Sequence, residues 1–269
     1  MSRVLITNDD GIAAPGLRAL AQAAVAAGHE VVAAAPAEEA SGASAALSAY
    51  TDDGRVMIGR HQLEGLPEVA AYGVAASPSY IVVLAMIEAF GAPPDLVLSG
   101  INRGANAGRA VLHSGTVGAA FTAAAYGCPA MAVSLDVLSD LVATAGGNAL
   151  TVLDEADDAA RNWPTAAALV RELLPGLADL PDGTVLNLNV PDRPPAEVLG
   201  LRQATLARFG QVQMGVAESG EGFIRTAVEE NRTRADEGTD LAWLTDGYAT
   251  LTAIRAVTEL DGYQATREW

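Results

Sequence analysis

The chain has no lysine, a single cysteine and few aromatic residues. All sixteen basic residues are arginine, against 33 acidic residues, which gives a net charge of −17. An acidic surface of this kind repels nucleic acid and anionic membranes, so we expect stable binding to neither. It also repels phosphorylated small molecules at long range. Any phosphate site therefore has to be built locally, from a metal ion, backbone N–H groups or a few arginines.

Two further absences concern redox chemistry and membranes. Cys128 is the only cysteine, so no intrachain disulfide can form, and we interpret it as a buried structural thiol rather than a reactive one. No run approaches 18 strongly apolar residues, so no transmembrane helix is expected. The first residues lack a basic segment, an apolar run and a cleavage site, and from this we expect a cytoplasmic protein.

The order of apolar and polar segments predicts an α/β fold. A chain of 269 residues suits one large domain or a core with an appendage, and can bury a substantial core. The first 135 residues alternate between the two element types, with strands expected at 4–6, 30–35, 56–61, 69–74, 95–99 and 130–135 and helices at 15–27, 79–90 and 116–126. Such alternation predicts a mostly parallel sheet covered by helices on both faces.

The second half of the chain is less regular. The pattern weakens over 139–158, where Gly146-Gly147-Asn148 indicates a surface loop, and a helix at 164–174 and a strand at 184–190 follow. Beyond Pro195, short alternating runs at 200–208 and 247–254 predict antiparallel hairpins. The polar, glycine-bearing residues between them, 209–240, predict an extended arm or loops.

Two adjacent carboxylates follow the first expected strand, in Thr7-Asn8-Asp9-Asp10-Gly11. Ligands of open α/β sheets bind at the carboxyl ends of the strands. Neighbouring anions there repel unless a cation or a shared proton compensates, and a hard divalent metal prefers oxygen ligands. A helix cap near Pro15 would explain one aspartate but not the pair. We therefore predict a metal site at Asp9 and Asp10.

Two other segments follow expected strands. Ser41-Gly42-Ala43-Ser44 carries small hydroxyl residues that could approach a metal or phosphate, or form an ordinary turn. Residues 99–108 contain three glycines and two asparagines. Asn102 offers a neutral oxygen ligand, and the glycines leave backbone N–H groups free to bind an anion. The alternative is a long surface loop, although such loops in compact domains are often functional.

Ser114-Gly115-Thr116 leads directly into an expected helix. Hydroxyl groups, backbone donors and the helix dipole all favour a phosphate there. A plain helix cap by Ser114 or Thr116 is the competing explanation. The preceding His113 is either a general acid or base or a neutral packed histidine.

In combination and order, these segments resemble the SurE family of metal-dependent survival-protein nucleotidases, over residues 3 to about 254. The resemblance rests on Ile6–Gly11 with Ala14-Pro15-Gly16, Ala35-Pro36 with Ser41–Ser44, Ser99–Asn102 with Gly104, Asn106 and Gly108, Ser114–Ala120, Leu186–Pro191, and Thr239-Asp240 with Asp246-Gly247-Tyr248.

The resemblance implies a fold, a reaction and a set of site residues. The fold is a Rossmann-like three-layer core at 1–195, with a C-terminal hairpin arm and returning tail at 196–269 that subunits exchange in homodimers or homotetramers. The reaction is hydrolysis of nucleoside 5′- or 3′-monophosphates. The implied roles are one Mg²⁺ or Mn²⁺ per subunit held by Asp9, Asp10, Ser41 and Asn102; phosphate held by Asn106, Ser114, Gly115 and Thr116; and catalysis by Asp9, Asp10, Asn102 and Ser114.

Three departures from the family pattern bear on the substrate. Ala37-Glu38-Glu39-Ala40 stands where the family has an Asp-Arg-Asn-Arg-like basic segment, His113 replaces a common tyrosine, and Gly73–Tyr80 replaces a Gly-Thr-Pro-X-Asp-Cys-Val pattern. Two alternatives therefore stay open. One is a phosphatase for another phosphorylated metabolite, and the other is a non-catalytic protein that binds nucleotide or metal.

Two unrelated functions fit the sequence poorly. A phosphatase of the haloacid dehalogenase type would need a nucleophilic aspartate at position 8, which is Asn8. A Rossmann dehydrogenase would need Gly-X-Gly-X-X-Gly after the first strand, where this chain has Asn-Asp-Asp-Gly.

Overall fold

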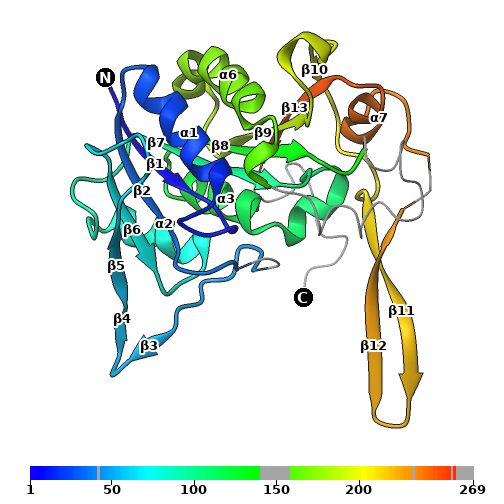
Figure 1. The fold of residues 1–269 in the computed structure, drawn as a ribbon, viewed down its shortest axis with the longest axis horizontal. Helices are drawn as coiled ribbons and strands as arrows, with labels where there is room; N and C mark the ends of the chain where they lie inside the picture. The colour runs from blue at the N-terminus through cyan, green and yellow to red at the C-terminus, as the bar shows by residue number, and fades with distance from the viewer. Residues whose placement is uncertain (41–42, 140–157, 232–233, 256, 259–269) are drawn as a thin grey trace, which may run out of the picture.

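The computed structural model describes residues 1–40, 43–139, 158–231, 234–255 and 257–258, and its centre is a nine-stranded sheet (Figure 1). Strands β9, β8, β7, β1, β2 and β6 are parallel neighbours in that order. From one edge to the other the strands are β10 (Leu201–Gln203), β13 (Ala249–Arg255), β9 (Thr184–Pro191), β8 (Ala130–Asp136), β7 (Leu96–Arg103), β1 (Arg3–Thr7), β2 (Glu30–Pro36), β6 (Ala70–Val74) and β5 (Ile58–His61). The expected mostly parallel α/β sheet is confirmed.

Helices cover both faces of this sheet. Helices α1 (Pro15–Ala26) and α6 (Trp163–Leu173) pack on one face, and α2 (Pro78–Met86) and α3 (Gly115–Ala125) pack on the other. Side chains of β1 alternate between the two faces of the sheet. Val4 and Ile6 pack in the hydrophobic core beneath α1 and α6, and Leu5 packs in the core beneath α2 and α3. The result is the expected three-layer arrangement. No helix of the described residues is long and apolar enough to cross a membrane.

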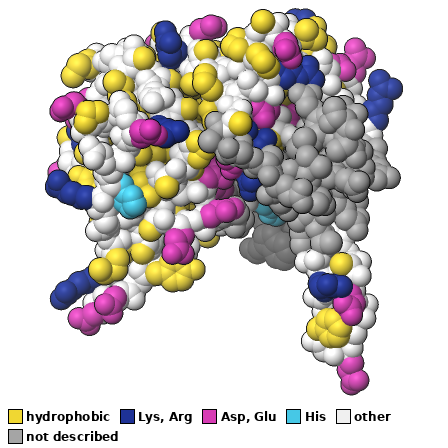
Figure 2. All heavy atoms as spheres, in the orientation of Figure 1, with side chains coloured by type: hydrophobic (Ala, Val, Ile, Leu, Met, Phe, Trp, Pro, Cys, Tyr) yellow, Lys and Arg dark blue, Asp and Glu magenta, His cyan; other side chains and the backbone are white. Residues whose placement is uncertain are grey.

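The C-terminal third supplies both an arm and two strands of the sheet. Strands β11 (Val212–Gly220) and β12 (Phe223–Glu230) pair antiparallel and project from the body, as expected for 209–240 (Figures 1 and 2). The expected hairpins at 200–208 and 247–254 are wrong. Strand β10 pairs in parallel with β13, and β13 pairs antiparallel with β9. Alternation marks a half-buried strand but does not identify its partner, which here comes from a distant part of the chain.

Smaller differences concern short elements. The strand expected at 56–61 is interrupted, because Arg55–Val56 forms β4 with β3 (Thr51–Asp52), whereas Ile58–His61 forms β5 on β6. A short helix, α7 (Asp240–Thr245), follows the arm and was not expected. The loop at 146–148 lies outside the described residues. The division at residue 195 stays a prediction, although β10 and β13 carry later residues into the sheet.

Cys128 is a buried structural thiol, as predicted. Its Sγ lies 3.5 Å from the carbonyl oxygen of Pro94. Burial, with a smaller contribution from the charge of Asp95, raises the pKa of this thiol to about 12. At neutral pH the thiol is therefore protonated and unreactive.

A close contact between α1 and β7 makes Gly16 sensitive to substitution. A Cβ atom at Gly16 would lie 2.0 Å from the carbonyl oxygen of Ile101 and 3.0 Å from the ring of Trp163. We expect Gly16→Ala to destabilise the fold by about 1–3 kcal/mol through overpacking, visible as a lower Tm in thermal denaturation. Gly176→Ala is the control, because no atom lies within 4 Å of its Cβ position. Equal Tm values for the two variants would contradict this packing argument.

Candidate functional site

The turn after β1 is fixed by Asn8. Its side chain accepts a hydrogen bond from Gly11 N–H and donates one to the Gly11 carbonyl, both at 3.1 Å. Gly11 has a φ of +99°, a conformation that glycine adopts without strain. The Asp9 carbonyl accepts a hydrogen bond from Ala40 N–H at 2.8 Å. These contacts hold both aspartates at the carboxyl edge of the sheet.

The Asp9 carboxylate lies against the N-terminus of α3. Its Oδ1 accepts a hydrogen bond from the Thr116 hydroxyl. Burial raises the pKa of Asp9, while hydrogen bonds from Thr116 and from the backbone of Thr116 and Gly115 oppose this rise. A Cβ atom at Gly115 would lie 2.7 Å from Asp9 Oδ2. Only glycine at position 115 therefore lets the carboxylate reach the helix terminus.

Asp10 is affected more strongly by its surroundings. Burial first, and then the charge of Asp9, raises the pKa of Asp10 to about 7, and Glu39 contributes in the same direction. The Arg103 backbone N–H, 3.3 Å from Asp10 Oδ2, and the Arg103 charge oppose the rise. Protein groups thus only partly compensate the charges of buried Asp9 and half-buried Asp10. A divalent cation would supply the missing positive charge.

Asn102 and Thr116 complete a set of oxygen donors beside Asp9. The Thr116 hydroxyl lies 3.3 Å from Asn102 Oδ1. The Asn102 amide nitrogen donates to the Gly104 carbonyl at 2.7 Å, which turns Oδ1 toward Thr116. The structure therefore brings Asp9, Asn102 and Thr116 together, with Asp10 next in sequence. Carboxylate, amide and hydroxyl oxygens suit a hard cation such as Mg²⁺ or Mn²⁺.

Not every predicted ligand is part of this description. Ser41 lies outside the described residues. Among the described residues, no group of three or more His, Cys, Asp and Glu side chains could hold a metal, so a cation here has to use neutral oxygens as well as the two aspartates. Nearby Ser44 donates through Oγ to the Leu112 carbonyl at 2.6 Å, so the segment following Ser41 runs beside the loop that leads into α3.

The predicted phosphate-binding residues differ in their surroundings. Ser114 caps α3, because its Oγ accepts from Val117 N–H at 3.1 Å, so the helix-cap explanation applies to it. The Thr116 hydroxyl does not cap the helix, because it donates a hydrogen bond to the Asp9 carboxylate. His113 is exposed at the end of a short 3₁₀ helix, Gly108–His113. The phosphate and catalytic roles of these residues stay predictions.

Asn106 is held by two asparagines of β9, whose positions the sequence had linked only to the family resemblance. Its carbonyl accepts from Asn187 Nδ2 at 2.7 Å and from Asn189 Nδ2 at 3.0 Å. Its N–H donates to Asn189 Oδ1 at 2.8 Å, and its amide nitrogen donates to Ser134 Oγ at 2.9 Å. The sheet thereby fixes the backbone of the loop between β7 and α3. The repeated asparagine in Asn187-Leu188-Asn189 was the sequence signal for this clamp.

Comparisons with known proteins agree with each other. Residues 4–214 match the family described as survival protein SurE. The chain is 33% identical to the 5′-nucleotidase SurE of Cyanothece sp., covering 99% of this chain and 96% of that protein. It is 35% identical to the 5′-nucleotidase SurE of Xanthomonas campestris pv. campestris, covering 98% and 92%. The crystal structure of the SurE protein from Aquifex aeolicus superposes with a TM-score of 0.68 at 25% identity, covering 94% and 93%.

The raised pKa of Asp10 predicts a pH-dependent stability for the metal-free protein. The folded state retains a proton on Asp10 that the unfolded state releases, so this contribution to stability falls between about pH 4 and pH 7 and is absent above it. We expect Asp10→Asn to raise the Tm in EDTA by about 5 °C at pH 8, equivalent to about 2 kcal/mol, and by much less at pH 4.5. Thermal denaturation at both pH values tests this.

The exposed Asp52 provides the matched control, because Asp52→Asn removes the same charge from the surface. Its Tm should follow that of the wild type at both pH values. If Asp10→Asn gave the same increment at pH 4.5 as at pH 8, Asp10 would not be the group that titrates.

Proposed function

This chain belongs to the SurE family, and from that premise we propose that it is a metal-dependent nucleotidase that removes phosphate from nucleoside 5′- or 3′-monophosphates. The observation that carries the proposal is the adjacent pair of buried Asp9 and half-buried Asp10, with the oxygens of Asn102 and Thr116 beside Asp9 at the carboxyl edge of the sheet. The similar proteins named 5′-nucleotidase SurE support the substrate class. The cytoplasmic location expected from the sequence is part of this proposal.

The donor set fits one Mg²⁺ or Mn²⁺ ion per subunit. Asp9, Asp10 and Asn102 would hold it, together with Ser41. Such an ion supplies Lewis acidity toward the phosphate group and toward water. The two carboxylates suit this role, because a cation would offset both the desolvation and the repulsion from Asp9 that raise the pKa of Asp10.

The remaining steps fall to side chains and backbone groups of the chain. Asp9 or Asp10 orients the attacking water and accepts its proton. Asn106, Ser114, Gly115 and Thr116 would bind the phosphoryl group and stabilise the charge that develops on it. The Thr116 hydroxyl and the backbone donors of Gly115 and Thr116 contact Asp9 in this structure, so phosphate would share these donors with Asp9. Gly115 is required at the start of α3, because a side chain there would collide with Asp9.

Glu39 favours a second candidate within the same reaction class. The negative charge of Glu39 contributes to the raised pKa of Asp10. A negative charge so close to the site repels phosphate, whereas a basic residue would attract it. A phosphatase specialised for a different phosphorylated metabolite would fit this reversal of charge. A protein that binds nucleotide or metal without turnover is the other alternative.

The activity is tested by phosphate release from a panel of nucleoside 5′- and 3′-monophosphates and other phosphomonoesters, with Mg²⁺, Mn²⁺ or EDTA. We expect metal-dependent release from nucleotides. Asp9→Asn should reduce kcat/KM by at least about 100-fold, since it removes a ligand charge and a proton acceptor, and should keep the circular dichroism spectrum unchanged.

The exposed variant Asp52→Asn should retain wild-type turnover. Near-wild-type activity in Asp9→Asn would refute the assignment of Asp9. Release only from other esters would favour the specialised phosphatase, and no release from folded protein with either metal would favour the binding protein.

We also propose that the arm joins subunits into a homodimer or homotetramer. It carries exposed apolar side chains at Val216, Phe223 and Ile224, which are 65%, 51% and 69% exposed. Apolar side chains on a projecting hairpin are typical of a surface that another chain covers. Figure 2 shows the arm standing clear of the body.

Removal of the arm tests this assembly. The Asn231 N–H donates to the Gln211 carbonyl at 2.7 Å, so the two ends of the arm lie together and Gly-Gly can replace residues 212–230. We expect light scattering to give a smaller assembly for the deletion, with the core still folded. Phe223→Ser in the intact arm should weaken the assembly in the same direction. An unchanged mass in both proteins would contradict the proposal.

A further inference from the structure

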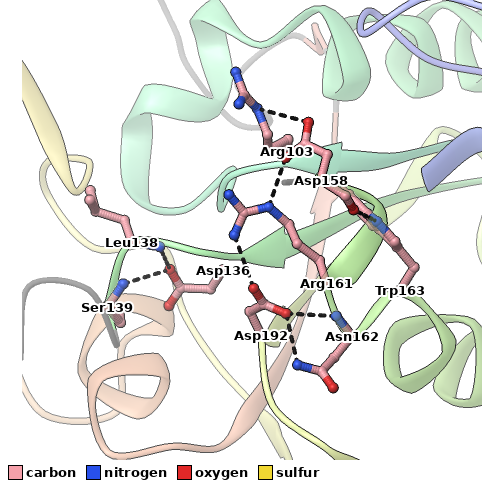
Figure 3. A network of polar contacts seen from close by, with 9 residues as sticks. All are labelled: Arg103, Asp136, Leu138, Ser139, Asp158, Arg161, Asn162, Trp163 and Asp192. Carbon is pink, nitrogen blue, oxygen red and sulfur yellow. Dashed lines mark hydrogen bonds and ion pairs between the residues drawn. The ribbon is translucent and has the colours of Figure 1, made fainter. Parts of the chain in front are cut away.

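Arg103 is the last residue of β7 and directly adjoins the candidate metal site. It follows Asn102, and its backbone N–H contacts Asp10. Its side chain is 31% exposed, and its Nε lies 3.7 Å from Asp158 Oδ2 (Figure 3). Arg103 therefore adjoins the site through its backbone, and its guanidinium is oriented by Asp158 while part of it remains accessible to a ligand.

A second layer of contacts fixes Asp158. Its Oδ1 accepts from Arg161 Nε at 2.8 Å, and its carbonyl accepts from Trp163 Nε1 at 2.6 Å. The Arg161 side chain is 7% exposed and also pairs with Asp192 at 3.1 Å. Asp192 in turn accepts from the backbone and side-chain nitrogens of Asn162, at 2.8 and 3.0 Å. The 3₁₀ turn Asp158–Ala160, which precedes α6, thus provides a fixed carboxylate that faces Arg103.

The acidic residues around the site oppose the binding of a phosphate group, and Arg103 carries the opposite charge. Asp9, Asp10 and Glu39 are acidic residues, and Glu38 and Glu39 closely precede Ser41 in the sequence. A phosphomonoester dianion needs positive charge beyond a metal ion to bind in such surroundings. The Arg103 side chain starts close to the site, because the backbone N–H of Arg103 lies 3.3 Å from Asp10 Oδ2. When Asp158 contacts the guanidinium through Nε, the two terminal nitrogens can still donate a pair of hydrogen bonds to an anion.

We propose that Arg103 is a substrate-binding residue whose guanidinium contacts the phosphate group of the bound ester, and that Asp158 is the residue that positions it. The inference rests on the proposed phosphatase function and assigns a positively charged side chain to an otherwise acidic site. Arg161 and Asp192 act only through Asp158.

The test compares Arg103→Gln with Arg171→Gln, which removes an exposed arginine from α6. We measure kcat and KM for a nucleoside monophosphate, and binding of inorganic phosphate to the Mn²⁺-loaded protein by calorimetry. Arg103→Gln should raise KM and the phosphate Kd at least 10-fold and lower kcat/KM by about 30–100-fold, as expected for one charged hydrogen-bond pair. Arg171→Gln should match the wild type.

Two further variants separate binding from structure. Arg103→Lys should recover part of the phosphate affinity, because it keeps the charge but loses the fork. Asp158→Asn should raise KM about 3–10-fold, less than Arg103→Gln does, with kcat changed less than twofold. Affinity for Mn²⁺ should not fall in Arg103→Gln, because the backbone and not the side chain of Arg103 contacts Asp10.

Some results would overturn the inference. One is a KM and a phosphate Kd for Arg103→Gln within twofold of the wild type. Another is a parallel loss of Mn²⁺ affinity, which would show a structural role. If the wild type releases no phosphate from any ester, the proposed function fails. Calorimetry with inorganic phosphate still decides the role of Arg103, since equal binding by the wild type and Arg103→Gln, or no binding by either, refutes it.

Discussion

The repulsion between two neighbouring carboxylates, one buried and one half-buried, is the constraint on which the site depends. Asp9 and Asp10 follow one another at the end of β1, and burial raises the pKa of both. Hydrogen-bond donors from two other elements of the fold offset part of this repulsion. The N-terminus of α3 faces Asp9 through Gly115 and Thr116, and the end of β7 faces Asp10 through a backbone N–H. These donors reduce the cost of the pair without neutralising it, which leaves a place for a cation.

Polar side chains on three neighbouring strands of the sheet support the loop beside this site. Asn102 on β7, Ser134 on β8 and Asn189 on β9 are neighbours in register. The last two hold Asn106, so the loop between β7 and α3 is tied to the sheet by its own backbone. The loop is also tied to the arm region, because the buried Asp240 accepts from Gly108 N–H at 2.7 Å.

Much of this arrangement could be predicted from local sequence. Apolar runs and glycine or proline stops located β1, α1, β2, β7, α3 and β8, and the rule that ligands bind at carboxyl ends placed Asp9, Asp10 and Asn102 together. Pairings between distant segments could not be predicted in this way. The alternating run at 247–254 identified a strand but not β9 as its neighbour, and no spacing rule connects Arg103 to Asp158. The Thr116 hydroxyl was assigned to phosphate, since the sequence does not show that Asp9 reaches the same helix terminus.

Short-range contacts have to decide substrate binding in a protein of this charge. At physiological ionic strength, exposed charges beyond about 8 Å are largely screened, so the net charge of −17 weakens the approach of a dianion more than its final binding. Within that distance, Glu39 opposes phosphate, whereas the donors of α3 and the guanidinium of Arg103 favour it. The glutamates at 38 and 39 then need not abolish phosphate binding. The positive partner that we propose for phosphate lies at the end of β7, where Asp158 holds the Arg103 side chain.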